Sequence, residues 1–178
     1  MGYTQLLETK EMNWKEETER RVNMGISFFK QGYNCSQSVT LAFADWYGVP
    51  QGLMARISAS FGGGMGRMRE TCGTASGMFM LAGLEEASEL ADKEVKARNY
   101  AVVQKLAADF KEQTGGTMIC RELLKGYVKN ITTHPVPDER TDEYYKKRPC
   151  VKMVELAIRT YMKYLSEKAE QQRQDNSK

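Results

Sequence analysis

Hydrophobic residues recur every three or four positions along most of this chain, with polar or glycine-containing breaks between the repeats. This spacing favours amphipathic helices, because one helical turn takes about 3.6 residues. No segment alternates convincingly with period two, and no alternation of strands with helices appears. The sequence therefore predicts an all-α, single-domain helical bundle of about six to seven helices. We expect helices at residues 22–29, 39–46, 53–60, 72–89, 95–110, 119–128 and 151–165.

The segment 72–89 differs from the others because it is apolar on every side rather than along one stripe. A helix of that kind is normally buried in the middle of a protein. Its apolar part is too short to cross a membrane and contains Gly77 and Gly83. We therefore expect it to be the central helix of the bundle.

The 178 residues suffice for one domain with a proper hydrophobic core. We divide the chain into an N-terminal extension at 1–12, a single helical four-cysteine domain at 13–166 and a polar C-terminal tail at 167–178. The tail is polar at almost every position, and we expect it to fray.

The composition limits which classes of partner the protein is expected to bind and where in the cell it is expected to be. The formal net charge is only +3 and no dense basic stripe occurs, so we expect no binding to nucleic acid. The N-terminal segment has no apolar signal-peptide core and no segment resembles a membrane span. We expect no membrane association and a cytoplasmic location, where cysteines are more often reactive or metal-bound than joined in permanent disulfides.

The four cysteines are far apart along the chain, and none forms a Cys-x-x-Cys pair. That spacing excludes the zinc-ribbon and thioredoxin motifs, and the lack of Cys-x-x-Cys-His excludes a covalent c-type haem. Each cysteine is instead predicted in the first turn of a helix, after a capping residue, a glycine or a proline. These are Asn34 before Cys35, Thr71 before Cys72, Gly116 before Cys120 and Pro149 before Cys150.

A helix start has a chemical consequence for a cysteine. Its unpaired N–H groups and the positive end of the helix dipole stabilise a thiolate, so we expect lowered thiol pKa values. The competing interpretation is that each cysteine is a small buried hydrophobe. Cations close in sequence would favour the thiolates further; they are Arg67 and Arg69 before Cys72, Arg121 beside Cys120, and Lys146, Lys147, Arg148 and Lys152 around Cys150.

These residues resemble a known family. The segment FGGGMGRMRETCGTASG at 61–77, with Asn34 and Cys35 before it and CRELL at 120–124 and Cys150 after it, is similar to the C_GCAxxG_C_C family. Its members are described as redox-active proteins with four characteristic cysteines. The resemblance covers residues 25–165, and the order and context of all four cysteines agree.

One position departs from the family signature, because Thr74 stands where a small apolar residue is usual. A helix first turn tolerates that change, and Cys72, Gly73 and Gly77 stay in place. The resemblance implies a helical fold and a redox or iron–sulfur role for Cys35, Cys72, Cys120 and Cys150, without a substrate or a reaction.

Two classes of function remain open. In the first, the four cysteines form a redox site, either by cycling between dithiol and disulfide or by binding an iron–sulfur cluster or zinc, and the protein serves an unidentified redox partner. In the second, the chain is a non-catalytic helical module that binds a partner or forms a homodimer, and its cysteines are structural. The cysteines could meet within one chain or across a dimer, and enzymatic activity is left open.

Four glycines are candidates for close backbone approach. Gly63 and Gly64 lie in a glycine-rich loop that matches neither the dinucleotide nor the P-loop pattern. We expect this loop to approach the helix beginning near Cys72, where a Cβ would collide. Gly73 and Gly77, four positions apart, would admit a second helix or leave room beside a cofactor, so all four are candidate cofactor-binding positions.

Two other groups are expected to have no catalytic role. His134, the single histidine, lies in a proline-bounded loop and should be exposed rather than act as a ligand or a base. Glu85, Glu86 and Glu89 cluster at the end of the central helix and are expected to form a solvated face.

Overall fold

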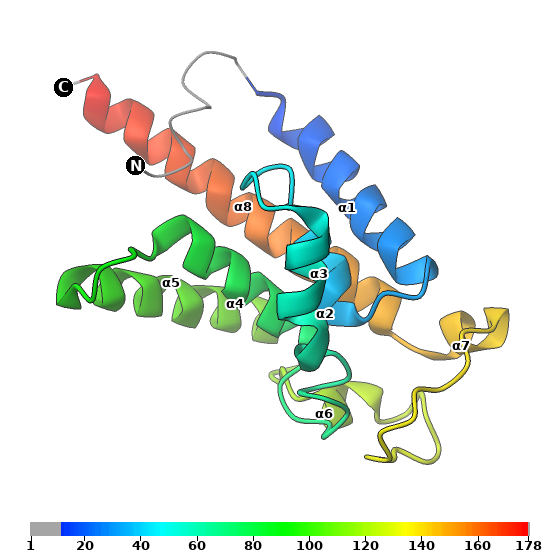
Figure 1. Ribbon diagram of the computed structural model, residues 1–178. Helices are drawn as coiled ribbons and strands as arrows, with labels where there is room; N and C mark the ends of the chain where they lie inside the picture. The colour runs from blue at the N-terminus through cyan, green and yellow to red at the C-terminus, as the bar shows by residue number, and fades with distance from the viewer. Residues whose placement is uncertain (1–11, 178) are drawn as a thin grey trace.

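A computed structural model describes residues 12–177 of the protein, and these residues form a helical bundle (Figure 1). Within this range no strand occurs, and extended pairing is limited to an isolated bridge between Thr71 and Ile119. The predicted all-α fold is confirmed. The elements are α1 (Trp14–Lys30), α2 (Cys35–Leu41), α3 (Gln51–Ser58), the 3₁₀ turn η2 (Ala59–Phe61), α4 (Gly73–Glu86), α5 (Lys93–Glu112), α6 (Cys120–Leu124), α7 (Asp142–Lys147) and α8 (Cys150–Asn176).

The helices are arranged around α4 and α8. Helix α1 lies along α8, and α5 folds back along α4 (Figure 1). The short α2 contacts α1, α4 and α8, so it links the two pairs. The loops that precede α4, α6 and α8 lie at one end of the bundle together with α7. None of the helices in the described range has both the length and the apolar character needed to cross a bilayer.

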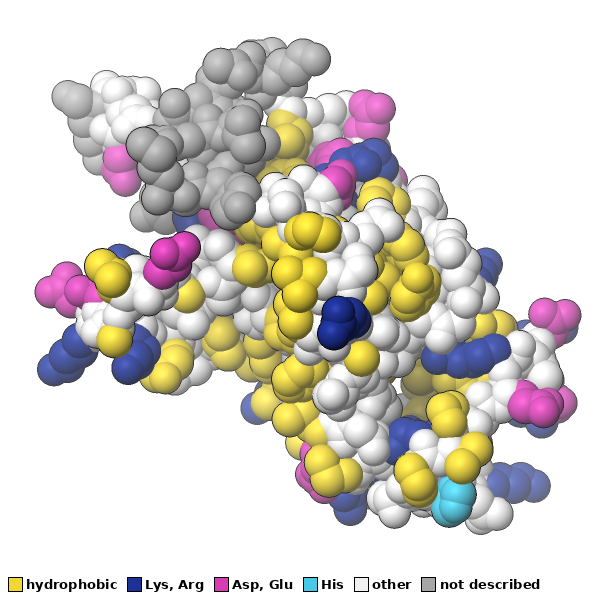
Figure 2. Space-filling model, in the orientation of Figure 1, with side chains coloured by type: hydrophobic (Ala, Val, Ile, Leu, Met, Phe, Trp, Pro, Cys, Tyr) yellow, Lys and Arg dark blue, Asp and Glu magenta, His cyan; other side chains and the backbone are white. Residues whose placement is uncertain are grey.

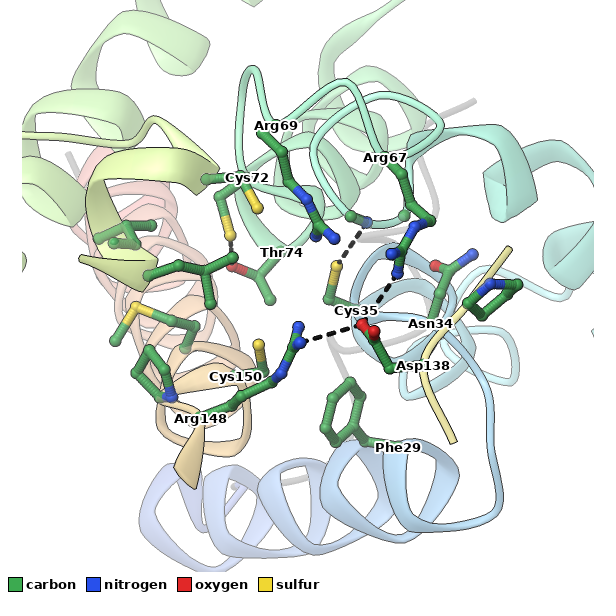
Figure 3. A pocket seen from close by; sticks show the side chains of 18 of the residues that line it. Phe29, Asn34, Cys35, Arg67, Arg69, Cys72, Thr74, Asp138, Arg148 and Cys150 are labelled. Carbon is green, nitrogen blue, oxygen red and sulfur yellow. Dashed lines mark hydrogen bonds and ion pairs between the residues drawn. The ribbon is translucent and has the colours of Figure 1, made fainter. Parts of the chain in front are cut away.

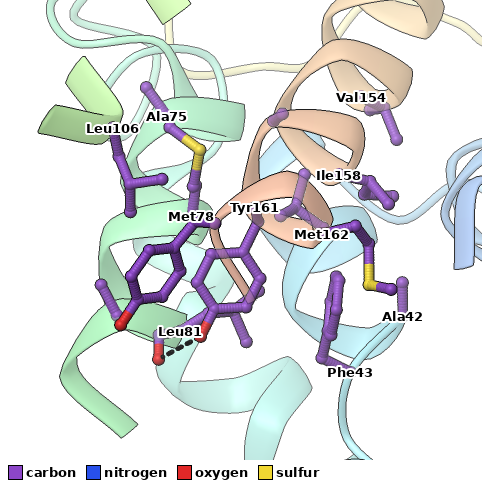
Figure 4. Close-up of a cluster of buried hydrophobic side chains, with 14 of the residues drawn as sticks. Ala42, Phe43, Ala75, Met78, Leu81, Leu106, Val154, Ile158, Tyr161 and Met162 are labelled. Atoms are coloured by element: carbon purple, nitrogen blue, oxygen red, sulfur yellow. Dashed lines mark hydrogen bonds between the residues drawn. The ribbon is translucent and has the colours of Figure 1, made fainter. Parts of the chain in front are cut away.

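The hydrophobic core forms where α4 and α8 face each other (Figure 4). Met78 and Leu81 of α4 and Ile158 and Tyr161 of α8 are fully buried, and Leu106 of α5 closes one side. Each large side chain of this kind contributes about 1.5–3 kcal/mol when it is withdrawn from water. Nine of the 14 residues of α4 are buried, so the prediction of a central helix is confirmed.

Helix α2 approaches α4 closely at two glycines. A Cβ at Gly77 would lie 2.9 Å from the carbonyl oxygen of Ser36 and 3.1 Å from Cβ of Val39. A Cβ at Gly73 would clash with the sulfur of Cys35. The absence of side chains at these positions therefore lets the first turn of α2 rest on the backbone of α4, as expected for a second helix at this face.

The helix boundaries differ from the prediction in the middle of the chain. Helix α2 ends at Leu41, and residues 42–48 form turns in which Phe43 and Tyr47 remain fully buried. Apolar spacing alone could not reveal this change, because turns can also bury large side chains. Helix α6 ends at Leu124 rather than near 128, and α7 was not predicted since none of its residues is buried.

The predicted frayed tail is wrong for residues 167–176, which continue α8. These residues are mostly strong helix formers such as Glu, Lys, Ala, Gln and Arg. Lys168 also anchors the segment, because its ammonium lies 2.8 Å from a carboxylate oxygen of Glu85 and 2.5 Å from one of Glu86. The predicted division into domain and tail remains a prediction, and residues 1–11 of the predicted extension lie outside the described residues.

The same ion pairs overturn the expectation of a solvated face at Glu85 and Glu86. The Glu85 side chain is 1% exposed, and it accepts a hydrogen bond of 3.2 Å from the hydroxyl of Tyr47. The Tyr47 hydroxyl also contacts that of Tyr161, which donates to the carbonyl oxygen of Leu81 at 2.9 Å. Helix α4 thus ends in a satisfied polar network, while its other end lies at Cys72.

The close contact at Gly77 predicts that replacing glycine by alanine has opposite effects on stability at two positions of α4, Gly77 and Gly83. Gly77→Ala should lower the free energy of unfolding by about 1–3 kcal/mol, because its Cβ meets the backbone of α2. Gly83→Ala has no atom within 4 Å of its Cβ and should raise stability by about 0.5–1 kcal/mol through helix propensity. Urea unfolding followed by circular dichroism measures both, and equal effects would contradict the close contact.

Candidate functional site

All four cysteines line one cavity of about 260 Å³ at the end of the bundle where the loops gather. Cys35, Cys120 and Cys150 are the first residues of α2, α6 and α8, and Cys72 immediately precedes α4. Figure 3 shows Cys35, Cys72 and Cys150 around this space. The predicted position of each cysteine at a helix start is confirmed, and all four line a cavity formed by one chain.

The start of α2 is fixed by a capping box. The Asn34 side chain accepts hydrogen bonds of 3.0 Å from the backbone N–H groups of both Ser36 and Gln37. The Gln37 side chain accepts in return from the Asn34 N–H at 2.9 Å. Such a box satisfies N–H groups that a helix start leaves unpaired, and it sets the direction in which Cys35 leaves the first turn.

Cys72 and Cys120 are brought together by the short bridge between Thr71 and Ile119. The Cys72 N–H donates to the carbonyl oxygen of Met118, and the Cys120 N–H donates to that of Glu70, both at 2.7 Å. In an antiparallel pair this register places the two cysteines diagonally on the same face. The helix starts of α4 and α6 therefore converge through backbone hydrogen bonds rather than through side-chain packing.

The loop between η2 and α4 has an unusual backbone. Residues 63–67 all have φ between +59° and +73°, and this run includes Met65 and Arg67. Arg69 also has a positive φ, +65°. A left-handed conformation costs a residue with a Cβ about 1–2 kcal/mol. The strained loop carries Arg67 and Arg69 to the cavity, and strain of this kind is concentrated at functional sites.

The glycines of this loop make two contacts with the cysteines. The Gly63 N–H donates to the sulfur of Cys35 at 3.4 Å. A Cβ at Gly64 would lie 2.6 Å from Cβ of Cys120. The loop thus approaches both cysteines, and the expected close approach at the start of the α4 segment is present. A role of Gly63, Gly64, Gly73 and Gly77 in holding a cofactor remains a prediction.

Burial raises the pKa of Cys72, Cys120 and Cys150, so the expectation of lowered values is wrong for these three. Burial is the largest cause in each case, and a negative charge on Cys35 adds to it. The pKa of Cys150 rises to about 12. A hydrogen bond from Arg69 acts in the opposite direction at Cys120 but is outweighed. Withdrawal from water therefore dominates over the helix starts, and all three are neutral thiols at pH 7.

The cavity also holds four arginines and one carboxylate. Arg67 and Arg148 share Asp138, whose carboxylate oxygen lies 3.1 Å and 2.9 Å from their guanidinium nitrogens. These two cations hold the pKa of Asp138 below its usual range against the effect of burial. Arg69 is 4% exposed, and its Nε donates to the carbonyl oxygen of Thr132 at 2.9 Å. The surroundings of the thiols are therefore strongly cationic.

The segment between α6 and α8 supplies a wall that the sequence analysis missed. It contributes Asp138, Arg140 and Tyr144 to the cavity. The Arg140 guanidinium carbon lies 4.4 Å from the ring centroid of Phe29 and 4.8 Å from that of Tyr144, which are cation–π contacts. The only sequence signal for these residues was a proline-bounded loop with mixed charges. His134 in the same loop is exposed, as expected.

The predicted cations divide into two groups. Arg67, Arg69 and Arg148 line the cavity. Arg69 forms its hydrogen bond with Cys120 rather than with Cys72. Arg121 pairs with Glu70 at 2.5 Å instead of reaching the adjacent Cys120. The remaining predicted cations are exposed; they are Lys146, Lys147 and Lys152.

The thiol arrangement does not fit a metal centre. Among residues 12–177, no three His, Cys, Asp or Glu side chains are placed so that they could hold a metal ion. An iron–sulfur cluster and a structural zinc ion each require convergent ligands, usually four. The four cysteines line the same space without converging on one point, and this disagrees with the iron–sulfur and zinc interpretations.

A comparison with family models agrees with the cysteine pattern. A model described as "Putative redox-active protein (C_GCAxxG_C_C)" matches residues 33–164, most of the chain, including all four cysteines. Comparisons with curated proteins and with solved structures give no match.

The left-handed backbone of the loop predicts that a substitution by glycine is more favourable for stability at Met65 than at Met68. Met65 has φ +59°, so Met65→Gly should relieve strain and raise the free energy of unfolding by about 0.5–1 kcal/mol. Met68 is exposed and has no positive φ, so Met68→Gly should lower stability by a similar amount. Urea unfolding compares the two variants, and the reverse order would contradict the loop conformation.

The raised pKa of Cys150 predicts a dependence of stability on alkaline pH. In the unfolded chain this thiol ionises near 9, but in the folded protein it ionises at about 12. Its contribution is therefore complete below pH 9 and is lost as the pH rises from 9 towards 12, because the unfolded state then binds fewer protons. Under reducing conditions, Cys150→Ser should lose stability less steeply than the wild type across that interval. Parallel curves would show that the thiol is not shielded in the folded protein.

Proposed function

This chain belongs to the C_GCAxxG_C_C family, and on that premise we propose that it is a thiol–disulfide redox protein in which Cys35 and Cys72 cycle between dithiol and disulfide. The observation that carries the proposal is the position of the Cys35 sulfur, which lies too close to the backbone of Gly73 to leave room for a Cβ there. Gly73 directly follows Cys72, so the Cys35 sulfur touches the backbone next to its proposed partner. A disulfide needs Cα atoms about 4.4–6.8 Å apart, so the proposal requires the Cα atoms of Cys35 and Cys72 to come within that range.

The two cysteines are suited to different steps. Cys35 is half-buried, so a molecule in the cavity can reach its sulfur. The N–H of Gly63 donates to that sulfur, and a donor of this kind stabilises negative charge on it. Cys72 is 6% exposed, and burial raises its pKa, so it stays protonated until a neighbouring sulfur becomes electrophilic. We assign the attack on substrate to Cys35 and the resolving step to Cys72.

The reaction is a balanced two-electron exchange with a disulfide substrate. The Cys35 thiolate attacks one substrate sulfur, the substrate S–S bond breaks, and the departing half takes up a proton and leaves as a thiol. The Cys72 sulfur then attacks Cys35 in the mixed disulfide and releases the second half as a thiol. The protons of Cys35 and Cys72 end on the two released thiols. The protein dithiol is oxidised to a disulfide, and the substrate disulfide is reduced.

The same thiol chemistry indicates the cellular compartment and the kind of redox partner. All four cysteines are free thiols in the fold, and a reducing compartment such as the cytoplasm maintains this state. We therefore propose a cytoplasmic location, and a redox partner that returns the Cys35–Cys72 disulfide to the dithiol.

Anaerobic titration of the reduced protein with bis(2-hydroxyethyl) disulfide tests the proposal. Peptide mapping of the wild type should find a Cys35–Cys72 disulfide that dithiothreitol reverses. Cys35→Ser should lose at least about tenfold in the rate of the first exchange, because the attacking sulfur is gone. Cys72→Ser should stop at a mixed disulfide on Cys35, and Cys150→Ser serves as the matched control that still completes the reaction.

Three results would overturn this assignment. A disulfide mapped to another pair of cysteines would make the proposed pairing wrong. Unchanged exchange in Cys35→Ser would show that another thiol attacks. A complete lack of reversible oxidation would favour the non-catalytic module with structural cysteines.

A further inference from the structure

The cavity contains more positive charge than its own carboxylate can balance. Four arginines line it against the single acidic residue Asp138, which Arg67 and Arg148 already share. The other two, Arg69 and Arg140, have no ion pair with a carboxylate of residues 12–177. A buried charge without a counter-charge is costly, so folded proteins normally pair it.

The contacts of Arg69 and Arg140 include no carboxylate at ion-pair distance, and Asp138, which Arg69 attracts from farther away, is already paired with Arg67 and Arg148. The Nε of Arg69 donates to the carbonyl oxygen of Thr132, and an Nη of Arg140 donates to that of Tyr33 at 3.3 Å. Carbonyl oxygens and aromatic rings orient a guanidinium but bring no formal charge. The Nη1 of Arg140 is buried and has no hydrogen-bond partner among the described residues. An arginine in the cavity wall therefore keeps a donor unused.

Three of the four cysteines supply none of the missing negative charge, and a thiolate at Cys35 would balance only one of the four arginines. Burial raises the pKa of Cys72, Cys120 and Cys150, so at neutral pH they carry none. Figure 3 shows that Arg69 points into the space between the labelled cysteines. Figure 2 shows this end of the molecule from outside, where Lys and Arg side chains in dark blue lie beside a recess near α7. The site therefore combines a reachable thiol with an excess of cationic side chains and one unsatisfied donor, on Arg140.

We infer that the cavity binds a small molecule bearing a carboxylate, which Arg140 and Arg69 hold while a disulfide within the same molecule faces Cys35. The substrate class rests on the proposed redox function, whereas anion binding by the arginines does not. An engineered cavity of about 150 Å³ takes up benzene, so the 260 Å³ here suits a ligand of roughly ten non-hydrogen atoms. Carboxylate recognition by a planar guanidinium supplies directed, charge-assisted hydrogen bonds.

Binding is tested apart from redox chemistry with adipate, a dicarboxylate that contains no sulfur. Isothermal titration of the reduced wild type should detect adipate binding that weakens with added salt, and no comparable binding of the neutral 1,6-hexanediol. Arg140→Gln should weaken adipate at least about tenfold, the usual loss for a hydrogen bond to a charged group, and Arg140→Lys should retain part of the affinity. Arg121→Gln is the matched control, since Arg121 pairs with Glu70 outside the cavity lining.

Equal affinity for adipate and hexanediol, or an equal loss in Arg121→Gln and Arg140→Gln, would overturn the inference. The comparison of the two ligands uses the wild type, so it stands even if Arg140→Gln fails to fold.

The substrate class is tested with two disulfides of similar size. Dithiodiglycolate has the same six-atom backbone length as adipate and carries two carboxylates, whereas bis(2-hydroxyethyl) disulfide is neutral. Each rate of protein oxidation is divided by the rate at which the same disulfide reacts with free 2-mercaptoethanol. After this correction the protein should react at least about tenfold faster with dithiodiglycolate than with the neutral disulfide, and Arg140→Gln should abolish this preference. Cysteine-dependent oxidation without a charge preference would overturn the substrate class and leave the redox function intact. Adipate binding without any exchange would overturn the redox function and leave the anion site intact.

Discussion

The site depends on the contact between α2 and α4, which two missing side chains make possible. A Cβ at Gly77 would clash with the backbone of Ser36, and one at Gly73 would clash with the Cys35 sulfur. Because protein interiors are close-packed, a single methyl group at this interface would separate the two helix starts. The remaining geometry follows from this contact, since α2 carries Cys35 towards α4, and the bridge between Thr71 and Ile119 adds Cys120 to the same end.

Two opposing electrostatic effects meet at the cysteines. Helix starts and arginines favour thiolates, whereas burial favours neutral thiols, and at Cys72, Cys120 and Cys150 burial has the larger effect. The arrangement separates Cys35, whose sulfur accepts a hydrogen bond from the Gly63 N–H, from three thiols that burial keeps protonated. Such a division suits sequential chemistry, because a protonated thiol beside a mixed disulfide does not compete with the attacking thiolate for substrate.

Much of this arrangement could be read from the sequence, because local rules determine it. Capping residues and breaks preceded each cysteine, and helical periodicity predicted the central position of α4. The pKa directions could not be predicted, since burial depends on which elements cover the sulfurs. Arg140 was missed for the same reason: it reaches the cavity from a loop distant in sequence and lies on the ring of Phe29. Glu85 was misassigned because its partner, Lys168, lies on a segment expected to be frayed.

The unfavourable features of the fold are concentrated at one end of the bundle. Residues 63–67 are left-handed, and Arg69 and an unpaired donor of Arg140 are buried there. Each feature lowers stability, and none improves the packing of the core between α4 and α8. At the other end of α4 the buried carboxylate of Glu85 is paired and hydrogen-bonded. The same helix thus joins a satisfied polar network to an unsatisfied one. If the fold simply tolerated buried charge, the two ends of α4 would not differ in this way. A negatively charged ligand that pairs with the arginines at the cationic end accounts for the difference.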